Sequence, residues 1–272
     1  MGAQRWINLG FIRLQPSELA KIAVVLALAM YYDWLSPEKV SRPFWVILPL
    51  ILTLIPAGLT FVQPDLGTSL LILASGGVIM FLAGVSIWYF IAAIVSVVGV
   101  VSAVLLSWGT SWQLLKDYQY RRIETFLNPE LDPLGSGYHI SQSKIALGSG
   151  GFNGRGFMEG TQTRLNFLPE KHTDFIFTTL AEEFGYVGTS FLLLLYALII
   201  AFCVHAMLIN RDRFGALLIG GVAATFFFYF AINMGMVMGL LPVVGVPLPL
   251  VSYGGSAMMV LLGAFGLVQS AH

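Results

Sequence analysis

The sequence LGTSLLILASGGVIMFLAGVSIWYFIAAIVSVVGVVSAVLLSWGTSWQLL, residues 66–115, contains no charged side chain. A helix needs about 20 apolar residues to cross the hydrocarbon core of a bilayer, so this segment is too long for a single crossing. The sequence Gly84-Val85-Ser86 lies near its middle and predicts a turn. The segment therefore predicts two membrane-spanning helices in succession.

Apolar segments on either side predict five more spans. The last 59 residues, 214–272, again carry no charge and are too long for one crossing, and the prolines of segment 240–249 cannot continue a helix. The predicted fold is all-α: a polytopic helical membrane protein with seven transmembrane helices and one long outer loop, 109–178, in a single membrane domain over residues 1–272. Besides the pair in 66–115, the predicted spans are 19–35, 44–62, 184–209 and the two parts of 214–272.

Composition supports this class of protein. Hydrophobic residues make up 57% of the chain and charged residues only 10%, against about 25% charged in an ordinary soluble domain. The 14 basic residues balance 14 acidic ones, which argues against a nucleic-acid partner, because such a partner requires a basic surface. The single cysteine, Cys203, lies in an apolar segment, so no disulfide framework or cysteine metal cluster is expected.

Basic residues in short loops predict the orientation. Loop 36–43 carries Lys39 and Arg42, and loop 210–213 carries Arg211 and Arg213. Four predicted helices separate these loops, so both are expected on the cytoplasmic side. Polar chemistry is then concentrated at the opposite, outer side, which contains the segments 63–65, 109–177 and 240–255.

Two outer segments carry charge at the start of a predicted helix. In the first, Pro16 suits a helix start and Ser17 with Glu18 would cap it, while Glu18 and Lys21, three residues apart, could also pair at the membrane edge. In the second, Asp65 is either a helix cap or a carboxylate directed into a polar cavity. Charges in such places are costly in lipid, which favours functional roles.

The long outer loop contains two notable segments. The glycines of 148–156 match neither the P-loop nor the dinucleotide fingerprint, so a flexible surface loop is favoured over a phosphate site. Segment 168–177 places Glu170, Lys171, His172 and Asp174 at the mouth of the following helix, where Thr173 or Asp174 could be an N-cap. His172 has no partner at a metal-ligand spacing, so no metal site is predicted there.

The proline-rich segment 241–256 reads as a re-entrant loop between the last two helices. Irregular backbone at this depth must be buried in protein or line a cavity. A structural kink is the alternative.

Taken together, these motifs resemble the SEDS family of bacterial cell-wall polymerases, and more closely its RodA branch than FtsW. The motifs are RWINLG (5–10), QPSELAK (15–21), QPDLGTS (63–69), GYHISQSKIALGSGG (137–151), LPEKHTDFIF (168–177), AEEFGYVG (181–188) and LPVVGVPLPLVSYGGSA (241–257). Family members have ten spanning helices, and the seven here resemble the fourth to the tenth. We therefore expect the chain to be an incomplete form of the enzyme.

The resemblance implies a peptidoglycan glycosyltransferase that polymerises lipid II during cell elongation and shape maintenance. It would lie in the bacterial inner membrane with its active face toward the periplasm, and its partner would be a class B penicillin-binding protein, a transpeptidase. Asp174 corresponds to the family's essential aspartate and is the expected catalytic base. A divalent cation, Mg²⁺ or Mn²⁺, is a candidate cofactor. The expected substrate-binding residues are Arg5, Arg13, Glu18, Lys21, Asp65, Lys171 and Ser252.

Two other classes of function remain open from the sequence. Intramembrane charges and broken helices also occur in transporters, so a lipid II flippase is the first alternative. A non-catalytic scaffold for cell-wall synthesis is the second. Against transport, the conspicuous charges lie at the outer helix ends rather than at the bilayer midplane.

Overall fold

The computed structural model describes most of the chain. The residues outside the description are 1–5, 9, 11–12, 111–112, 115–119, 121–123, 125–135 and 162–171, together with the side chains of Arg13, Ser136 and His139.

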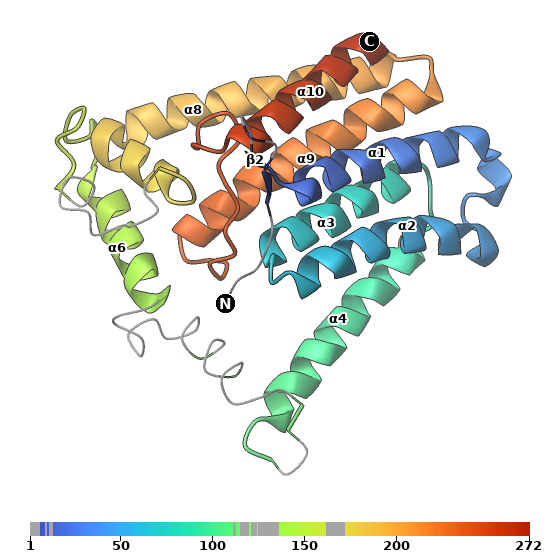
Figure 1. Cartoon of the computed structure of the whole chain (residues 1–272), viewed down its shortest axis with the longest axis horizontal. Helices are drawn as coiled ribbons and strands as arrows, with labels where there is room; N and C mark the ends of the chain where they lie inside the picture. The colour runs from blue at the N-terminus through green and yellow to red at the C-terminus, as the bar shows by residue number, and fades with distance from the viewer. Residues whose placement is uncertain are drawn as a thin grey trace.

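In the described part of the chain, a long helix lies at each of the seven predicted spans (Figure 1). A short antiparallel hairpin, β1 (Ile7–Asn8) with β2 (Arg13–Leu14), precedes the first of them. A 3₁₀ turn, Pro37–Lys39, follows it. The predicted turn at Gly84 separates the third helix from the fourth. The helices are α1 (Pro16–Trp34), α2 (Pro43–Val62), α3 (Leu66–Leu82), α4 (Ile87–Ser107), α8 (Ile176–Ile209), α9 (Arg213–Val237) and α10 (Gly255–Ala271).

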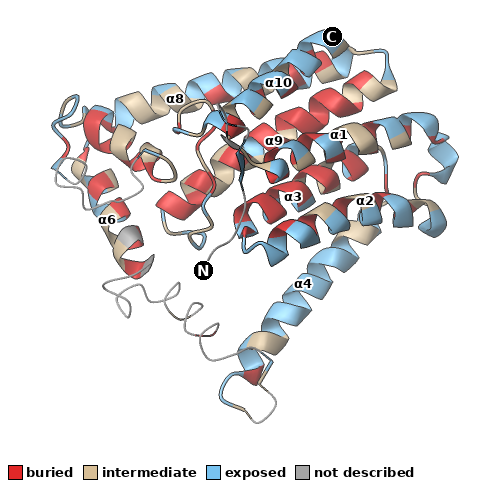
Figure 2. Cartoon of the chain, in the orientation of Figure 1, coloured by how far each residue is buried: buried red, intermediate tan, exposed pale blue. Residues whose placement is uncertain are grey.

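Length and surface chemistry indicate a membrane protein. Helices α2, α4, α8 and α9 are each long and apolar enough to cross a bilayer, and α3 and α10 are shorter apolar helices. Helix α4 exposes almost all of its isoleucine, valine and leucine side chains and extends away from the other helices (Figure 2). So large an apolar surface would be a liability in water and suits lipid.

The core is centred on α9, which is buried on most sides (Figure 2). Helix α9 contacts α1 and α3 on one side and α8 and α10 on the other. The larger apolar cluster joins α1, α2 and α3 to α9 and also includes side chains of α8 and α10, and a second cluster joins α8, α9 and α10. Cys203 is buried in the first cluster, as expected for a packing residue. The polar residues that α9 carries near its outer end are therefore held at the centre of the bundle.

The loops predicted to be cytoplasmic meet at one end of the bundle. Arg213 donates from Nη1 to the carbonyl oxygen of Leu35 at 2.8 Å, and Asn210 donates from Nδ2 to that of Ala271 at 2.6 Å. Ser41 bonds the carbonyl oxygen of Gly84 at 3.1 Å. The ends of α1, α3, α8 and α10 thus gather on one side, in agreement with the predicted topology.

Helix α8 begins at Ile176, eight residues before the predicted span, and bends at Gly185. The first two turns contain Glu182 and Glu183, which a search for uncharged segments excludes, yet both side chains are buried. The section after the bend, 187–209, is about 34 Å long at 1.5 Å per residue, enough to cross the hydrocarbon core. The bend would therefore lie near one membrane surface, with the first two turns extending beyond the hydrocarbon core.

The outer loop contains a further helix, α6 (Ser136–Ser149), which the sequence did not predict because it carries no clear apolar stripe. The glycine-rich segment that follows, for which a flexible loop was favoured, is hydrogen-bonded to α8. Two backbone amides of the segment donate to α8: Arg155 to the carbonyl of Glu182 and Gly156 to that of Glu183. Two amides of α8 donate back to the segment: Tyr186 to the carbonyl of Gly151 and Val187 to that of Phe152. The segment is therefore fastened around the bend of α8.

Replacing Gly185 with alanine should destabilise the protein. Gly185 has φ 63° and ψ −159°, a region that only glycine adopts readily, and an added Cβ would collide with the amide nitrogen of Gly154. Strain alone costs about 1–3 kcal/mol, so Gly185→Ala should lower the unfolding midpoint in detergent by several degrees. Gly99→Ala on α4, where a Cβ meets nothing within 4 Å, is the control. Equal midpoints for the two variants would contradict the prediction.

Candidate active site

A cavity of about 210 Å³ opens at the end of the bundle opposite the loops 36–43 and 210–213, the end that the sequence predicts to be the outer one. The starts of α1, α3 and α10 contribute to its wall, together with α9, the segment before α8 and the proline-rich loop. Predicted site residues from distant parts of the sequence meet here. Its polar and charged lining comprises Gln15, Glu18, Lys21, Asp65, Thr68, Thr173, Asp174, Tyr229, Tyr253 and Ser256, and its apolar lining includes Trp6, Leu71, Val246 and Pro247.

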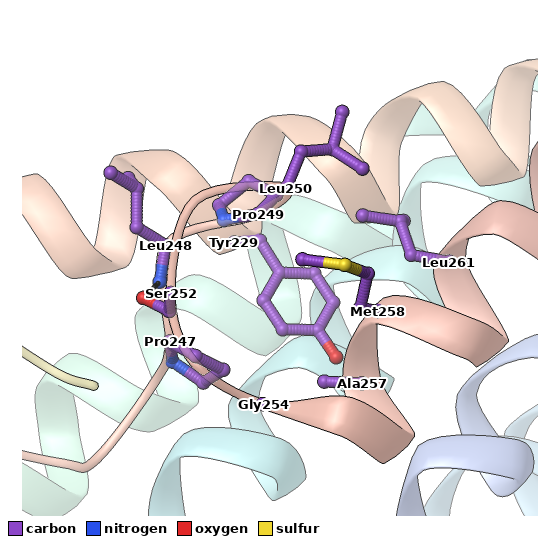
Figure 3. A pocket seen from close by; sticks show the side chains of 10 residues that line it. All are labelled: Tyr229, Pro247, Leu248, Pro249, Leu250, Ser252, Gly254, Ala257, Met258 and Leu261. Atoms are coloured by element: carbon purple, nitrogen blue, oxygen red, sulfur yellow. Dashed lines mark hydrogen bonds between the residues drawn. The ribbon is translucent and has the colours of Figure 1, made fainter. Parts of the chain in front are cut away.

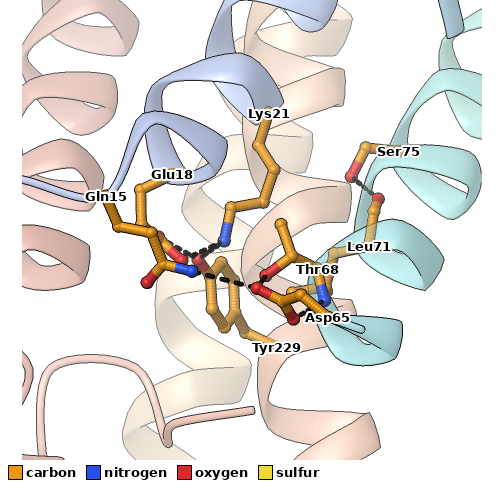
Figure 4. A network of polar contacts seen from close by, with 8 residues as sticks. All are labelled: Gln15, Glu18, Lys21, Asp65, Thr68, Leu71, Ser75 and Tyr229. Carbon is orange, nitrogen blue, oxygen red and sulfur yellow. Dashed lines mark hydrogen bonds and ion pairs between the residues drawn. The ribbon is translucent and has the colours of Figure 1, made fainter. Parts of the chain in front are cut away.

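Glu18 and Lys21 form the predicted pair, one turn apart on α1, and Tyr229 of α9 completes it (Figure 4). Lys21 Nζ lies 2.7 Å from Glu18 Oε1 and also bonds the Tyr229 hydroxyl. That hydroxyl donates to Glu18 Oε2 at 2.5 Å, and Lys21 Nζ lies 4.2 Å from the centre of the Tyr229 ring. Lys21 is only 1% exposed. The ammonium is tolerated because a carboxylate, a hydroxyl and an aromatic face surround it.

The ring of Tyr229 is held between the proline-rich loop and the start of α10 (Figure 3). Pro247, Leu248 and Met258 line a small apolar pocket with it. The apolar surroundings direct the hydroxyl toward the polar cavity. Tyr229 is not among the predicted site residues; its only signal in the sequence is the one hydroxyl within FFFYF, 226–230, since a buried tyrosine hydroxyl usually has a hydrogen-bond partner.

Asp65 fulfils both of the roles left open by the sequence. It is the N-cap of α3, and its Oδ1 accepts from the Thr68 amide at 3.1 Å. Its Oδ2 accepts from the Thr68 hydroxyl at 3.0 Å and from Gln15 Nε2 at 2.9 Å (Figure 4). Asp65 also lines the cavity. These bonds connect the start of α3 to the start of α1.

Asp174 lies half-buried in the cavity wall, just before α8. The N-cap of α8 is Phe175, so neither Thr173 nor Asp174 takes the capping position that the sequence allowed. A Cβ added to Gly245 would lie 3.4 Å from Asp174 Oδ2, so the carboxylate lies against bare backbone of the proline-rich loop. Gly245 has φ 72°, which favours glycine at this point of close approach.

The proline-rich loop is irregular, as predicted, and side chains satisfy its backbone. Tyr196 donates to the Pro249 carbonyl at 2.5 Å, and Ser252 accepts from the Leu248 amide at 2.7 Å. The Ser252 hydroxyl donates to the Thr173 carbonyl at 2.7 Å, and the Tyr253 amide donates to that of His172 at 2.9 Å. Ser252 therefore joins the loop to the segment that carries Asp174, and it lies outside the cavity lining.

The predicted site residues fall into three groups. The structure brings Glu18, Lys21, Asp65 and Asp174 into one cavity, and Ser252 holds the neighbouring loop. Arg5 and Lys171 lie outside the described residues. The backbone of Arg13 lies in β2, but its side chain is also outside the description.

A resident metal finds no ready site in the described part of the chain. No three histidine, cysteine, aspartate or glutamate side chains converge there. Within the cavity, Glu18 is engaged by Lys21 and Tyr229, and Asp65 by Thr68 and Gln15.

Comparison with known proteins gives consistent matches along the chain. The family model of the cell cycle proteins FtsW, RodA and SpoVE matches residues 1–272. The peptidoglycan glycosyltransferase MrdB of Escherichia coli K12 is 49% identical over 272 residues, which cover 100% of this chain and 71% of MrdB.

Two kinds of solved structure share the fold. A peptidoglycan synthase complex, described for its coordination of polymerization and crosslinking, matches with a TM-score of 0.81 and 34% identity over 98% of this chain and 72% of that one. The rod shape determining protein RodA of Thermus thermophilus matches with a TM-score of 0.64 and 30% identity, covering 98% of this chain and 68% of that one.

Removing one charge of the buried pair should cost more stability than removing both. Lys21→Met leaves the Glu18 carboxylate buried without its cation, which typically costs about 3–5 kcal/mol. Glu18→Gln in the same chain removes the stranded charge, so the double variant should recover part of that loss. Thermal unfolding in detergent measures the stability of the single and the double variant. Lys39→Met is the control, because Lys39 is exposed at the opposite end of the bundle. A double variant less stable than Lys21→Met would contradict this assignment.

Proposed function

We propose that this chain polymerises lipid II with Asp174 as the general base. The chain belongs to the family of the cell cycle proteins FtsW, RodA and SpoVE and is a peptidoglycan glycosyltransferase. The observation that carries the assignment is the position of Asp174. Its carboxylate is half-buried in a polar cavity at the end of the bundle opposite the basic loops, and it lies beside Gly245, which has a positive φ. A sugar hydroxyl presented from the outer leaflet could reach it there.

In the proposed reaction Asp174 accepts the proton of an acceptor sugar hydroxyl. The hydroxyl oxygen attacks the anomeric carbon of the donor as the bond from that carbon to undecaprenyl pyrophosphate breaks. One displacement inverts the anomeric carbon, so no second carboxylate is required as a nucleophile. General-base assistance contributes about 10²- to 10⁴-fold to such a step.

The other cavity residues would orient the substrates. Lys21 presents positive charge at the cavity wall, and Tyr229 orients the Lys21 ammonium group. Lys21 and Tyr229 would therefore interact with the pyrophosphate. Asp65 would help to shape the sugar site through its bonds to Gln15 and Thr68. Arg5, Arg13 and Lys171 are the further candidates for contacts with the pyrophosphate.

The remaining assignments follow from the substrate. Lipid II polymerises outside the cytoplasm, so the cavity would face the periplasm from the inner membrane, with the Lys39 and Arg211 loops in the cytoplasm. A class B penicillin-binding protein is proposed as the partner. The similarity to a synthase complex that combines polymerization with crosslinking supports this pairing.

Asp174→Asn should reduce polymerisation of purified lipid II by about 10²-fold or more, because the amide cannot accept the proton. The rate is measured as glycan product per enzyme in detergent or proteoliposomes. Asp33→Asn, an exposed carboxylate at the other end of α1, is the matched control and should retain the normal rate. A well-folded Asp174→Asn protein that polymerises normally would remove Asp174 from the catalytic role.

A chelator should lower the same rate if a cation accompanies the pyrophosphate. Mg²⁺ is commonly bound by one or two carboxylates together with substrate phosphates, so it needs no protein cluster of three acids. EDTA should suppress product formation, and added Mg²⁺ or Mn²⁺ should restore it. Full activity in EDTA would show that the side chains alone stabilise the leaving group.

A further inference from the structure

Asn233, on α9 close to its outer end, connects the two irregular segments that face each other at the cavity. Its side chain is completely buried. Nδ2 donates one hydrogen bond to the carbonyl oxygen of Asp174 at 2.8 Å and another to that of Val246 at 2.7 Å. Both amide hydrogens are thereby used, one on each segment.

These two bonds fix what the carboxylate of Asp174 faces. Val246 follows Gly245, whose Cα hydrogens lie beside Asp174 Oδ2. Ser252 and Tyr253 also hold the Asp174 segment, but they belong to the same irregular loop. Asn233 belongs to the most buried helix of the bundle, so it ties both segments to a rigid element.

The amide makes these bonds at some cost. Asn233 Oδ1 is buried and has no hydrogen-bond partner among the described residues. An unpaired buried acceptor destabilises a fold and calls for a specific explanation. An aspartate of the same shape cannot donate two bonds, and a leucine of similar size donates none. Two carbonyls at one point require a side chain with two donor hydrogens, and the asparagine amide supplies them without a charge.

We propose that Asn233 is a positioning residue for the glycosyl transfer: its amide holds the backbone of Asp174 and of the proline-rich loop at a fixed separation, which aims the general base at the acceptor hydroxyl. The inference rests on the proposed function of Asp174. Asn233 is absent from the cavity lining, so it acts through Asp174 and makes no contact with substrate.

The first test is the kinetics of Asn233→Leu. Displacement of a catalytic group by about 1 Å can cost 10²-fold in rate, so kcat for lipid II polymerisation should fall by about that factor. KM should stay within about threefold, because the cavity lining is unchanged. Asn233→Gln keeps the two donors on a longer side chain and should recover part of the rate. An unchanged kcat in folded Asn233→Leu would overturn the proposal.

The second test separates positioning from general damage to the structure. In a chain that already carries Asp174→Asn, adding Asn233→Leu should lower the residual rate by less than threefold, since there is no longer a base to aim. A structural defect would lower the rate by the same factor in both backgrounds, and that result would overturn the proposal. If Asn233→Leu does not fold, Asn233→Gln enters the same cycle.

Asn210→Leu is the matched control. It removes a similar amide-to-carbonyl bond, from Asn210 Nδ2 to Ala271, at the opposite end of the bundle, and should leave kcat unchanged while lowering the unfolding midpoint. The rate of Asp174→Asn alone is measured first. A normal rate there refutes the general-base assignment itself, which is distinct from failure of the Asn233 cycle.

Discussion

Polar groups buried inside a membrane bundle have little water to bind, and this constraint shapes the end of the molecule that carries the cavity. Charges and irregular backbone persist there only where other parts of the protein satisfy them. The Glu18–Lys21 pair meets the condition through the Tyr229 hydroxyl and ring. The proline-rich loop meets it through Tyr196, Asn233 and Ser252. The same contacts that make these groups tolerable also determine the shape of the cavity.

Most of the fold follows from the sequence because every helix that crosses lipid must be a long apolar segment. Uncharged segments of about 20 residues identify the spans, and Gly84 and the prolines of 240–249 identify the breaks, within a few residues of the observed helix ends. The failures have the same origin. Glu182 and Glu183 hid the first turns of α8, and α6 has no apolar stripe to reveal it.

The candidate site was predictable in part. Asp65, Glu18 and Lys21 are conspicuous as charges beside apolar segments, and the family resemblance identified Asp174. Tyr229 and Asn233 were missed because a single polar side chain in a buried helix has no sequence pattern of its own. Asn233 bonds the backbone of Asp174, which lies 59 residues away along the chain, and Tyr229 bonds Glu18, which lies 211 residues away. Only the folded structure brings these groups together.

The charge balance of the cavity bears on how a pyrophosphate can leave. Its described lining holds three carboxylates, on Glu18, Asp65 and Asp174, against the one ammonium of Lys21. Lys21 is already bonded to Glu18, so this lining by itself carries too little positive charge for a pyrophosphate. In the proposed reaction the missing charge would come from the basic residues nearest in sequence, such as Arg13 and Lys171, or from a cation brought with the substrate. In the proposed mechanism, hydrogen bonds already engage Glu18 and Asp65, so Asp174 would serve as the base for the acceptor while the positive charge for the donor would come from outside this lining.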